Sequence, residues 1–278
     1  MKLYLVRHGR SAGNLPGRMI GWSDHSLTSF GVAQAERVAL RLAPLGPMPI
    51  YASDLPRALE TAACIAAQWS REPGAAGTPA AEGTAGAGGA GAAGKSGAVA
   101  AVAVHPDRRL REIDLGDYEG RSWDEFTADH ELAAAFAREP LATALPGGES
   151  LDGVRQRVLA AFDEIVAREP ETACLVAHDG PIRAILNHVL RVPRERHWAI
   201  STSHGGLSLL ETGEGWVSVR FVNDTSHLVG LDEAAFESAA LEAAAALDGA
   251  GTAHGADDVA AAVAGDDGGA PARAIEGL

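Results

Sequence analysis

Residues 2–14 of this 278-residue chain read KLYLVRHGRSAGN, a short apolar run followed at once by a polar loop. The run from Lys2 to Val6 has the length and the large aliphatic side chains that are typical of a buried strand. Arg7 and His8 come directly after it, where the strand should end. In sheets covered by helices on both faces, ligands bind beyond the carboxyl ends of the strands. We therefore take Arg7 and His8 as the first candidate site residues.

The rest of the chain alternates short apolar runs with helical patterns. Buried strands are predicted at residues 2–6, 49–53, 99–104, 173–177, 207–211 and 217–222. Apolar side chains at helical spacing lie between them, for example in the stripe within 154–165. This alternation predicts an α/β fold whose sheet is covered by helices on both faces.

Three residues are expected to mark the starts of helices. Thr28 can cap a helix that buries Val32 and the apolar positions that follow it. Asp54 can cap a second helix, and Pro181 can open another. Each predicted helix follows a predicted strand, so helix N-termini should gather near the strand ends.

Composition limits the class of protein. The formal net charge of −14 argues against a nucleic-acid partner, because affinity for a phosphate backbone needs clustered cations. Cys64 and Cys174 lie far apart and form no CxxC motif, so we expect neither a disulfide framework nor a cysteine zinc site. No apolar run reaches the roughly 18 residues of a membrane span, and an arginine comes too early for a signal peptide. We therefore predict a cytoplasmic protein with no membrane partner.

Two segments differ in composition from the rest. Residues 74–98 hold 9 Gly and 10 Ala among 25 positions and are expected to form a flexible insertion. Within it, residues 89–96 match the P-loop pattern GxxxxGKS/T, but no apolar strand precedes them, so we assign no nucleotide site. Residues 232–278 hold ten acidic side chains against one basic side chain and are expected to be a largely disordered tail. One catalytic domain, residues 1–231, should therefore carry the chemistry.

Arginines and histidines follow three of the predicted strands. Arg7 and His8 follow the first strand, Arg57 lies shortly after the second, and His178 follows the fourth. Guanidinium groups match phosphate oxygens, and helix N-termini add partial positive charge, so these strand ends predict a phosphate pocket. A neutral imidazole in such a pocket can attack phosphorus and form a phosphohistidine. The leaving alkoxide then needs a proton, and Glu112 is the candidate acid.

Several motifs in order extend this pattern. They are LVRHG at 5–9, DHSLT at 24–28, SDLPRA at 53–58, RE at 111–112 with GDYEG at 116–120, GGES at 147–150 and VAH at 176–178. Together they resemble the histidine phosphatase superfamily, in its phosphoglycerate-mutase-like branch. The subgroup that the chain resembles is that of alpha-ribazole phosphatases and broad-specificity phosphatases. The resemblance implies a three-layer α/β sandwich with a mostly parallel central sheet, and no metal or organic cofactor.

The resemblance also implies a role for each candidate residue. His8 would be the nucleophile, and Glu112 would be the proton donor and then the base for water. The phosphoryl oxygens would be bound by Arg7, Arg57 and His178. Further contacts with the phosphate are expected from Ser11, Asn14, Asp179 and Gly180.

Three functions stay open at this point. The favoured one is a metal-independent phosphomonoesterase that acts on a small organic phosphate. A phosphomutase of the phosphoglycerate mutase type is the alternative, although the segment around Glu112 resembles the phosphatases. Arg10 and Asp179 depart from the usual family residues and leave the subgroup open. The third function is a non-catalytic phospholigand-binding protein that kept the pocket, and the presence of Glu112 argues against it. The sequence leaves open both the substrate and the oligomeric state, for which a homodimer is one alternative.

Overall fold

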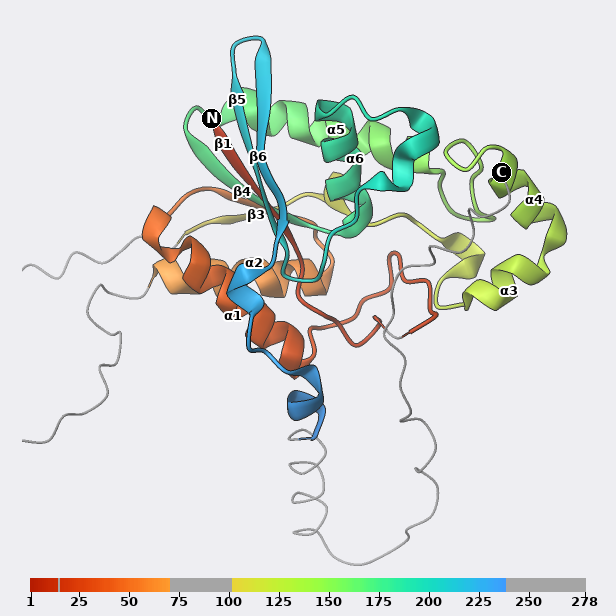
Figure 1. Ribbon diagram of the computed structural model, residues 1–278, viewed down its shortest axis with the longest axis horizontal. Helices are drawn as coiled ribbons and strands as arrows, with labels where there is room; N and C mark the ends of the chain where they lie inside the picture. The colour runs from red at the N-terminus through yellow and green to blue at the C-terminus, as the bar shows by residue number, and fades with distance from the viewer. Residues whose placement is uncertain (15, 71–101, 239–278) are drawn as a thin grey trace, which may run out of the picture.

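The computed structural model describes residues 1–14, 16–70 and 102–238. A six-stranded sheet runs through its centre in the order β3-β2-β4-β1-β5-β6 (Figure 1). The strands are β1 Lys2–Arg7, β2 Ile50–Ala52, β3 Val104–Pro106, β4 Thr172–Ala177, β5 Leu207–Gly213 and β6 Trp216–Asp224. The pairs among β1, β2, β3 and β4 are parallel, whereas β5 is antiparallel to both β1 and β6. The mostly parallel sheet is thus confirmed.

The strand β3 differs from the range predicted for it. The apolar run predicts a strand at 99–104, of which 99–101 lie outside the described residues. β3 begins at Val104, after the described residues 102 and 103, and continues through His105 to Pro106. β3 lies at the edge of the sheet, where it pairs with β2. An edge strand has one row of backbone groups that faces away from the sheet, so it accepts a proline that a central strand would exclude. For this reason the apolar pattern, which stops at Val104, misses the end of the strand at Pro106.

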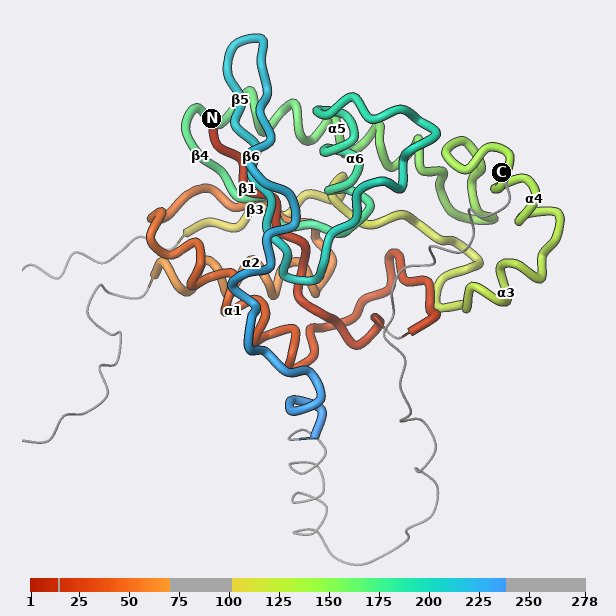
Figure 2. The backbone as a smooth tube through the Cα atoms, viewed as in Figure 1, coloured from red at the N-terminus to blue at the C-terminus, as the bar shows by residue number. Residues whose placement is uncertain are grey.

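Helices lie on both faces of the sheet. The α-helices are α1 Ser29–Leu42, α2 Pro56–Trp69, α3 Trp123–Ala128, α4 His130–Arg138, α5 Leu151–Arg168 and α6 Asp179–Val189. Short 3-10 helices are η1 Ala43–Leu45, η2 Arg108–Leu110, η3 Gly116–Tyr118, η4 Arg194–Ala199 and η5 Ser226–Leu228. Figures 1 and 2 show α1 and α2 on one face of the sheet and α5 and α6 on the other. The described chain therefore forms the predicted three-layer sandwich.

Successive side chains of β1 pack alternately in two hydrophobic cores, one on each face of the sheet. Leu3 and Leu5 pack in the cluster of α5 and α6, whereas Tyr4 and Val6 pack in the cluster of α1 and α2. An extended strand imposes this period of two. The predicted stripe within 154–165 belongs to the first of these clusters. Because β1 is packed on both faces, the core determines where its carboxyl end lies.

The start of α1 agrees with the sequence except at one residue. Thr28 caps the helix by accepting a hydrogen bond from the N–H of Gly31 over 3.0 Å. Val32, however, is 38% exposed, so the prediction that α1 buries it is wrong. The buried stripe is centred on Val38 and Leu42, and Val32 lies at its border in the first turn.

The other two helix starts differ from their predictions. The N-cap of α2 is Leu55, and no side chain caps the helix, so the predicted cap by Asp54 is wrong. The Asp54 carboxylate instead pairs with the guanidinium of Arg111, at 2.6 Å from Nε and 2.8 Å from Nη2. α6 begins at Asp179, which places Pro181 inside its first turn rather than at its first residue.

Helices α3 and α4 form a separate unit beside the sandwich. Figure 1 shows α3 and α4 apart from the two helical layers, on the side toward which the loop after β1 extends. Met19 of that loop packs with Leu115, Tyr118 and Phe126 in a third core cluster. The N–H of Met19 also donates to the carbonyl of Arg121 over 2.9 Å. These contacts therefore join the loop after β1 to the segment that follows Glu112.

Several predicted segments fall outside the described residues. These are the insertion 74–98, the P-loop-like stretch 89–96 and residues 239–278 of the acidic segment. The described start of that segment contacts the domain, because Glu233 pairs with Arg10 and the ring of Phe236 lies 5.7 Å from that of Phe30. Within the described ranges, none of the helices has the length and apolar character needed to cross a membrane.

Candidate active site

His8 lies one residue beyond β1 and is 2% exposed. Its backbone N–H donates to the carbonyl of Ala177 over 3.0 Å, which joins it to the end of β4. Its Nδ1 lies 2.6 Å from the carbonyl oxygen of Gly9. A carbonyl can only accept, so Nδ1 carries a hydrogen, and in the neutral ring Nε2 then keeps its lone pair. This is the form of histidine that can attack phosphorus.

His178 packs against His8 from the end of β4. The two ring centroids are 4.9 Å apart, with an interplanar angle of 61°. Nε2 of the fully buried His178 lies 2.8 Å from the hydroxyl of Ser53, which follows β2. Its Nδ1 is buried and has no partner among the described residues. The parallel strands β1, β2 and β4 therefore bring His8, Ser53 and His178 together beyond the carboxyl ends of the strands.

Arg57 reaches the same strand ends from the first turn of α2 and is 1% exposed. Its Nη1 and Nη2 donate to the carbonyls of Ser23 and Gly21 over 2.9 and 2.7 Å. Its Nε is buried without a partner in the described chain. One turn along α2, the hydroxyl of Thr61 accepts from the N–H of Gly9 over 3.1 Å. α2 therefore positions both Arg57 and the loop that holds His8.

Arg7 ends β1, and its guanidinium turns toward the loop before β5. Nη1 donates to the carbonyl of Thr202, and Nη2 donates to Nε2 of His204 over 3.1 Å. Nε of Arg7 has no partner within the described residues, as in Arg57. Buried polar atoms are normally hydrogen-bonded, so two unpartnered guanidinium N–H groups beside a buried histidine mark a place suited to an anion.

Glu112 lies at the N-terminus of α6. Its Oε2 accepts from the N–H of Gly180 over 3.2 Å, and its Oε1 accepts from the N–H of Ile113 over 3.0 Å. Its negative charge also acts on both Arg7 and Arg57. A carboxyl group at this place can exchange a proton with an oxygen atom bound between the arginines.

The structure joins Ser11 and Asn14 to each other. The hydroxyl and the N–H of Ser11 donate to Oδ1 of Asn14 over 2.7 and 3.0 Å. Both lie in the loop after His8, so this pair shapes the loop. Their contact with a phosphate stays a prediction.

The Asp179 carboxylate is engaged by the fold. It accepts from the N–H and the hydroxyl of Thr202 over 2.8 and 2.9 Å, and it pairs with Arg183. Such a carboxylate holds the loop before β5 against α6. Its contact with a phosphate also stays a prediction, and one that these bonds do not favour.

The family model for the histidine phosphatase superfamily (branch 1) matches residues 3–75 and 91–225. The chain belongs to this superfamily. "Probable phosphoglycerate mutase GpmB" from Yersinia pestis is 28% identical over 236 residues, which cover 82% of this chain and 95% of the relative. The resemblance inferred from the motifs is thus confirmed.

Two solved structures extend the comparison. Bacillus stearothermophilus YhfR has a TM-score of 0.65 and 29% identity, and the match covers 82% of this chain and 98% of YhfR. Mycobacterial glucosyl-3-phosphoglycerate phosphatase in complex with VO3 has a TM-score of 0.63 and 28% identity, with 81% and 99% of the two chains covered. The described fold is therefore that of the superfamily along nearly the whole length of these relatives.

Burial and nearby cations keep the imidazoles of His8 and His178 neutral. Burial lowers the pKa of His8 well below its usual value, and the charges of Arg57 and Arg7 lower it further. Burial also lowers the pKa of His178, with smaller effects from His8 and Arg57. Nε2 of His8 is therefore unprotonated at neutral pH. These imidazoles form no metal cluster, since no group of three or more His, Cys, Asp or Glu in the described ranges is placed to hold a metal ion.

Two residues of the site escape the sequence analysis. The ring of His204 lies 5.2 Å from that of His8, and its Nε2 accepts from Arg7. Arg157 of α5 donates to the backbone carbonyl of Glu112 over 2.7 Å. Neither residue has a local signal, because their partners lie 197 and 45 positions away in the chain.

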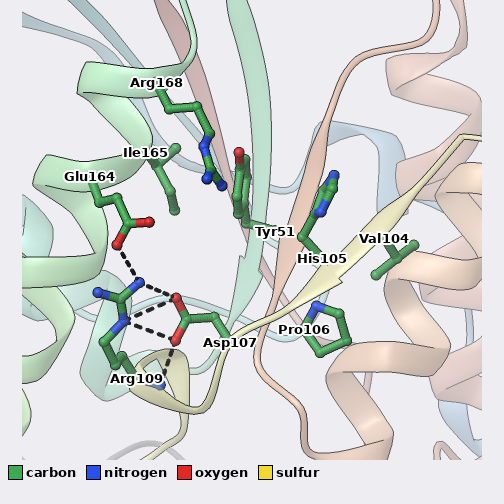
Figure 3. Close-up of a pocket in the computed structure, with 9 residues that line it drawn as sticks. All are labelled: Tyr51, Val104, His105, Pro106, Asp107, Arg109, Glu164, Ile165 and Arg168. Atoms are coloured by element: carbon green, nitrogen blue, oxygen red, sulfur yellow. Dashed lines mark hydrogen bonds and ion pairs between the residues drawn. The ribbon is translucent and has the colours of Figure 1, made fainter.

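A separate cavity of about 270 Å³ lies between α5 and the edge strand β3 (Figure 3). Tyr51 and His105 stack beside it, with ring centroids 5.2 Å apart. Figure 3 shows Arg109 bonded to both Asp107 and Glu164. None of the nine side chains that line this cavity carries a buried polar atom without a partner. We therefore place the candidate active site at the strand ends and not in this cavity.

Proposed function

We propose that this protein is a metal-independent phosphomonoesterase that hydrolyses a small organic phosphate through a phosphohistidine on His8. One observation carries the proposal: Nε of Arg7, Nε of Arg57 and Nδ1 of His178 are buried without partners among the described residues, beside the nucleophile. Nε2 of His178 lies 2.8 Å from the hydroxyl of Ser53, and in the tautomer in which that hydroxyl donates, the ring hydrogen is on Nδ1. All three atoms can then donate to phosphoryl oxygens, and the guanidinium bonds are charge-assisted.

The reaction takes two steps. In the first step, Nε2 of His8 bonds to phosphorus while the bond from phosphorus to the ester oxygen breaks, and protonated Glu112 gives its proton to the leaving oxygen. In the second step, the Glu112 carboxylate takes a proton from water, the water oxygen bonds to phosphorus, and the phosphorus–nitrogen bond breaks. His8 returns to its neutral form, and inorganic phosphate leaves. Arg7 and Arg57 stabilise the charge of the group in transfer.

The related proteins suggest which substrates to test first. One solved relative is a glucosyl-3-phosphoglycerate phosphatase, and one curated relative is a probable phosphoglycerate mutase. Small phosphate monoesters of sugars and of glycerate are accordingly the first candidates.

The test is phosphate release from a panel of such esters by the wild type, His8→Ala and the control His130→Gln. His130 is exposed on α4, so its replacement should leave turnover unchanged. We expect His8→Ala to lower turnover at least about a thousandfold, since the nucleophile is lost. Acid quenching of the wild type during turnover should trap an acid-labile phosphohistidine. Undiminished activity in His8→Ala would reject the mechanism.

A phosphomutase is the second candidate, and the similarity to the probable phosphoglycerate mutase favours it. Both reactions share the first step and differ in whether the phosphoryl group passes to water or to another hydroxyl. Phosphorus NMR of the product mixture separates them, because transfer faster than release would indicate a mutase. Binding of the panel without either reaction would indicate a phospholigand-binding protein.

The location in the cytoplasm and the homodimeric state stay predictions. Cell fractionation tests the first, and light scattering of the purified full chain tests the second.

A further inference from the structure

His204 lies in the turn that leads into β5, and the backbone of this turn is bonded to the nucleophile segment. The N–H of Gly205 donates to the carbonyls of Arg7 and His8 over 3.0 and 3.2 Å. The N–H of Arg7 donates in turn to the carbonyl of Gly206 over 3.1 Å. Gly205 has a φ of +70°, a left-handed conformation that glycine adopts without strain. The turn therefore fixes His204 directly beside the end of β1.

The half-buried side chain of His204 contacts both Arg7 and His8. Nη2 of Arg7 lies 3.1 Å from Nε2 of His204. A guanidinium has only donors, so Nε2 must be the acceptor and must be unprotonated. The ring centroid of His204 lies 5.2 Å from that of His8, at an interplanar angle of 54°. His8 therefore contacts a second imidazole besides His178.

The surroundings of His204 preserve this acceptor. Burial lowers the pKa of His204 well below its usual value, and the charge of Arg7 lowers it further. His8, Arg10 and Arg57 act in the same direction. A protonated ring would lose the bond from Arg7 and would add a positive charge beside it.

The turn leaves one nitrogen of Arg7 free. Nη1 is held by the carbonyl of Thr202 and Nη2 by His204, while Nε is buried without a partner in the described chain. We propose that His204 is a positioning residue: its Nε2 fixes the plane of the Arg7 guanidinium so that Nε–H is presented to the phosphoryl group. This role rests on the proposed phosphoryl transfer to His8.

Positioning and simple packing make different demands on residue 204. Packing requires only the volume of the ring, whereas positioning requires an acceptor where Nε2 lies. Glutamine can place its amide oxygen near that point, and leucine fills a similar volume without any acceptor. The two substitutions therefore separate the two roles.

The experiment compares wild type, His204→Leu and His204→Gln, with His105→Leu on the edge strand β3 as the matched control. It measures kcat, KM and inhibition by vanadate, which mimics the phosphoryl group in transfer. We expect His204→Leu to lower kcat by about 10- to 100-fold with a smaller change in KM, and to weaken vanadate inhibition in parallel. His204→Gln should recover most of the lost kcat. His105→Leu should match the wild type.

A second readout does not depend on turnover. Calorimetric binding of inorganic phosphate should weaken in His204→Leu and stay close to wild type in His204→Gln. Equal losses in both variants would overturn the positioning role in favour of ring volume, and wild-type behaviour of both would overturn it altogether. If His204→Leu does not fold, as judged by near-UV circular dichroism, His204→Asn serves as the variant without an acceptor at this point.

These outcomes separate the two proposals. An active wild type with unaffected His204 variants rejects only the role of His204. A wild type that binds phosphate, with the predicted loss in His204→Leu, but hydrolyses no ester rejects the proposed function and supports the positioning of Arg7.

Discussion

The N–H of Gly180 donates to Oε2 of Glu112 over 3.2 Å, and a Cβ atom at residue 180 would lie 2.2 Å from Oε1 of the same carboxylate. The first turn of α6 thus approaches the proposed acid so closely that any side chain there would displace it. The observed partner of Gly180 is this acid, while its expected contact with phosphate stays a prediction.

Gly180→Ala should therefore displace the Glu112 carboxylate and lower kcat by about tenfold or more, toward the value of Glu112→Gln. The matched control is Gly153→Ala in α5, where the nearest atoms would lie at an ordinary 3.6 Å. The control should keep full kcat and raise the free energy of unfolding by about 0.5–1 kcal/mol, because alanine favours a helix over glycine. Steady-state kinetics and urea unfolding measure both effects. A Gly180→Ala variant with full kcat would contradict the role of Glu112.

Arg57→Lys should lower kcat/KM by about 100-fold, although the charge is kept. The guanidinium of Arg57 bonds to the carbonyls of Gly21 and Ser23 and still has Nε–H left, whereas a lysine offers one nitrogen. Arg41→Lys is the control, since Arg41 is half exposed and pairs with Asp224 at 3.8 Å. Kinetics of both variants on the same ester check the prediction. An equal effect of the two substitutions would show that only the charge matters.

Arg157→Met should reduce both stability and kcat. Arg157 donates to the carbonyls of Arg109, Arg111 and Glu112 over 2.8, 2.6 and 2.7 Å, and it pairs with Glu149 at 2.5 Å. Loss of these bonds leaves partly buried acceptors unpaired, which should cost about 2–4 kcal/mol in the free energy of unfolding.

Urea unfolding and kcat should be measured for Arg157→Met beside Arg155→Met, whose side chain is exposed on the same helix. We expect the control to match the wild type in both. Unchanged kcat in a destabilised Arg157→Met would limit the role of Arg157 to the fold.

The stability of the protein should fall as the pH falls from about 6.5 to 4. Burial lowers the pKa of His197 to about 4, and the pKa values of His8 and His178 lie well below the usual 6.5. Below pH 6.5 the unfolded chain binds protons that the native state does not bind, so unfolding becomes more favourable. Each such histidine contributes up to about 1.4 kcal/mol per pH unit.

Urea midpoints at several pH values check this dependence, and His197→Phe should make it less steep. A midpoint that stays constant between pH 7 and 5 would contradict it.

Much of the site could be predicted because its main residues follow strands. Arg7, His8 and His178 occur directly after apolar runs. In a parallel sheet the carboxyl ends of the strands lie on the same side, whatever the length of the chain between them. Arg57 was predictable for the same reason, since it lies in the first turn of the helix after β2.

The residues that escaped prediction act through distant partners. The sequence shows neither that Arg157 of α5 donates to the backbone carbonyl of Glu112 nor that His204 accepts a hydrogen bond from Arg7. Local propensity also failed where tertiary contacts decide: the Asp54 carboxylate binds Arg111 instead of capping α2, and Pro106 is tolerated because β3 lies at an edge.

The reversal of β5 has a consequence for protein engineering. Because β5 runs antiparallel to β1, its first residue lies where β1 ends, and the turn before it places His204 beside Arg7 and His8. If β5 ran parallel to β1, that turn would lie at the amino end of β1 instead. This turn is therefore a place where one side chain beside Arg7 and His8 can be exchanged while β1, β4 and α2 keep their sequence.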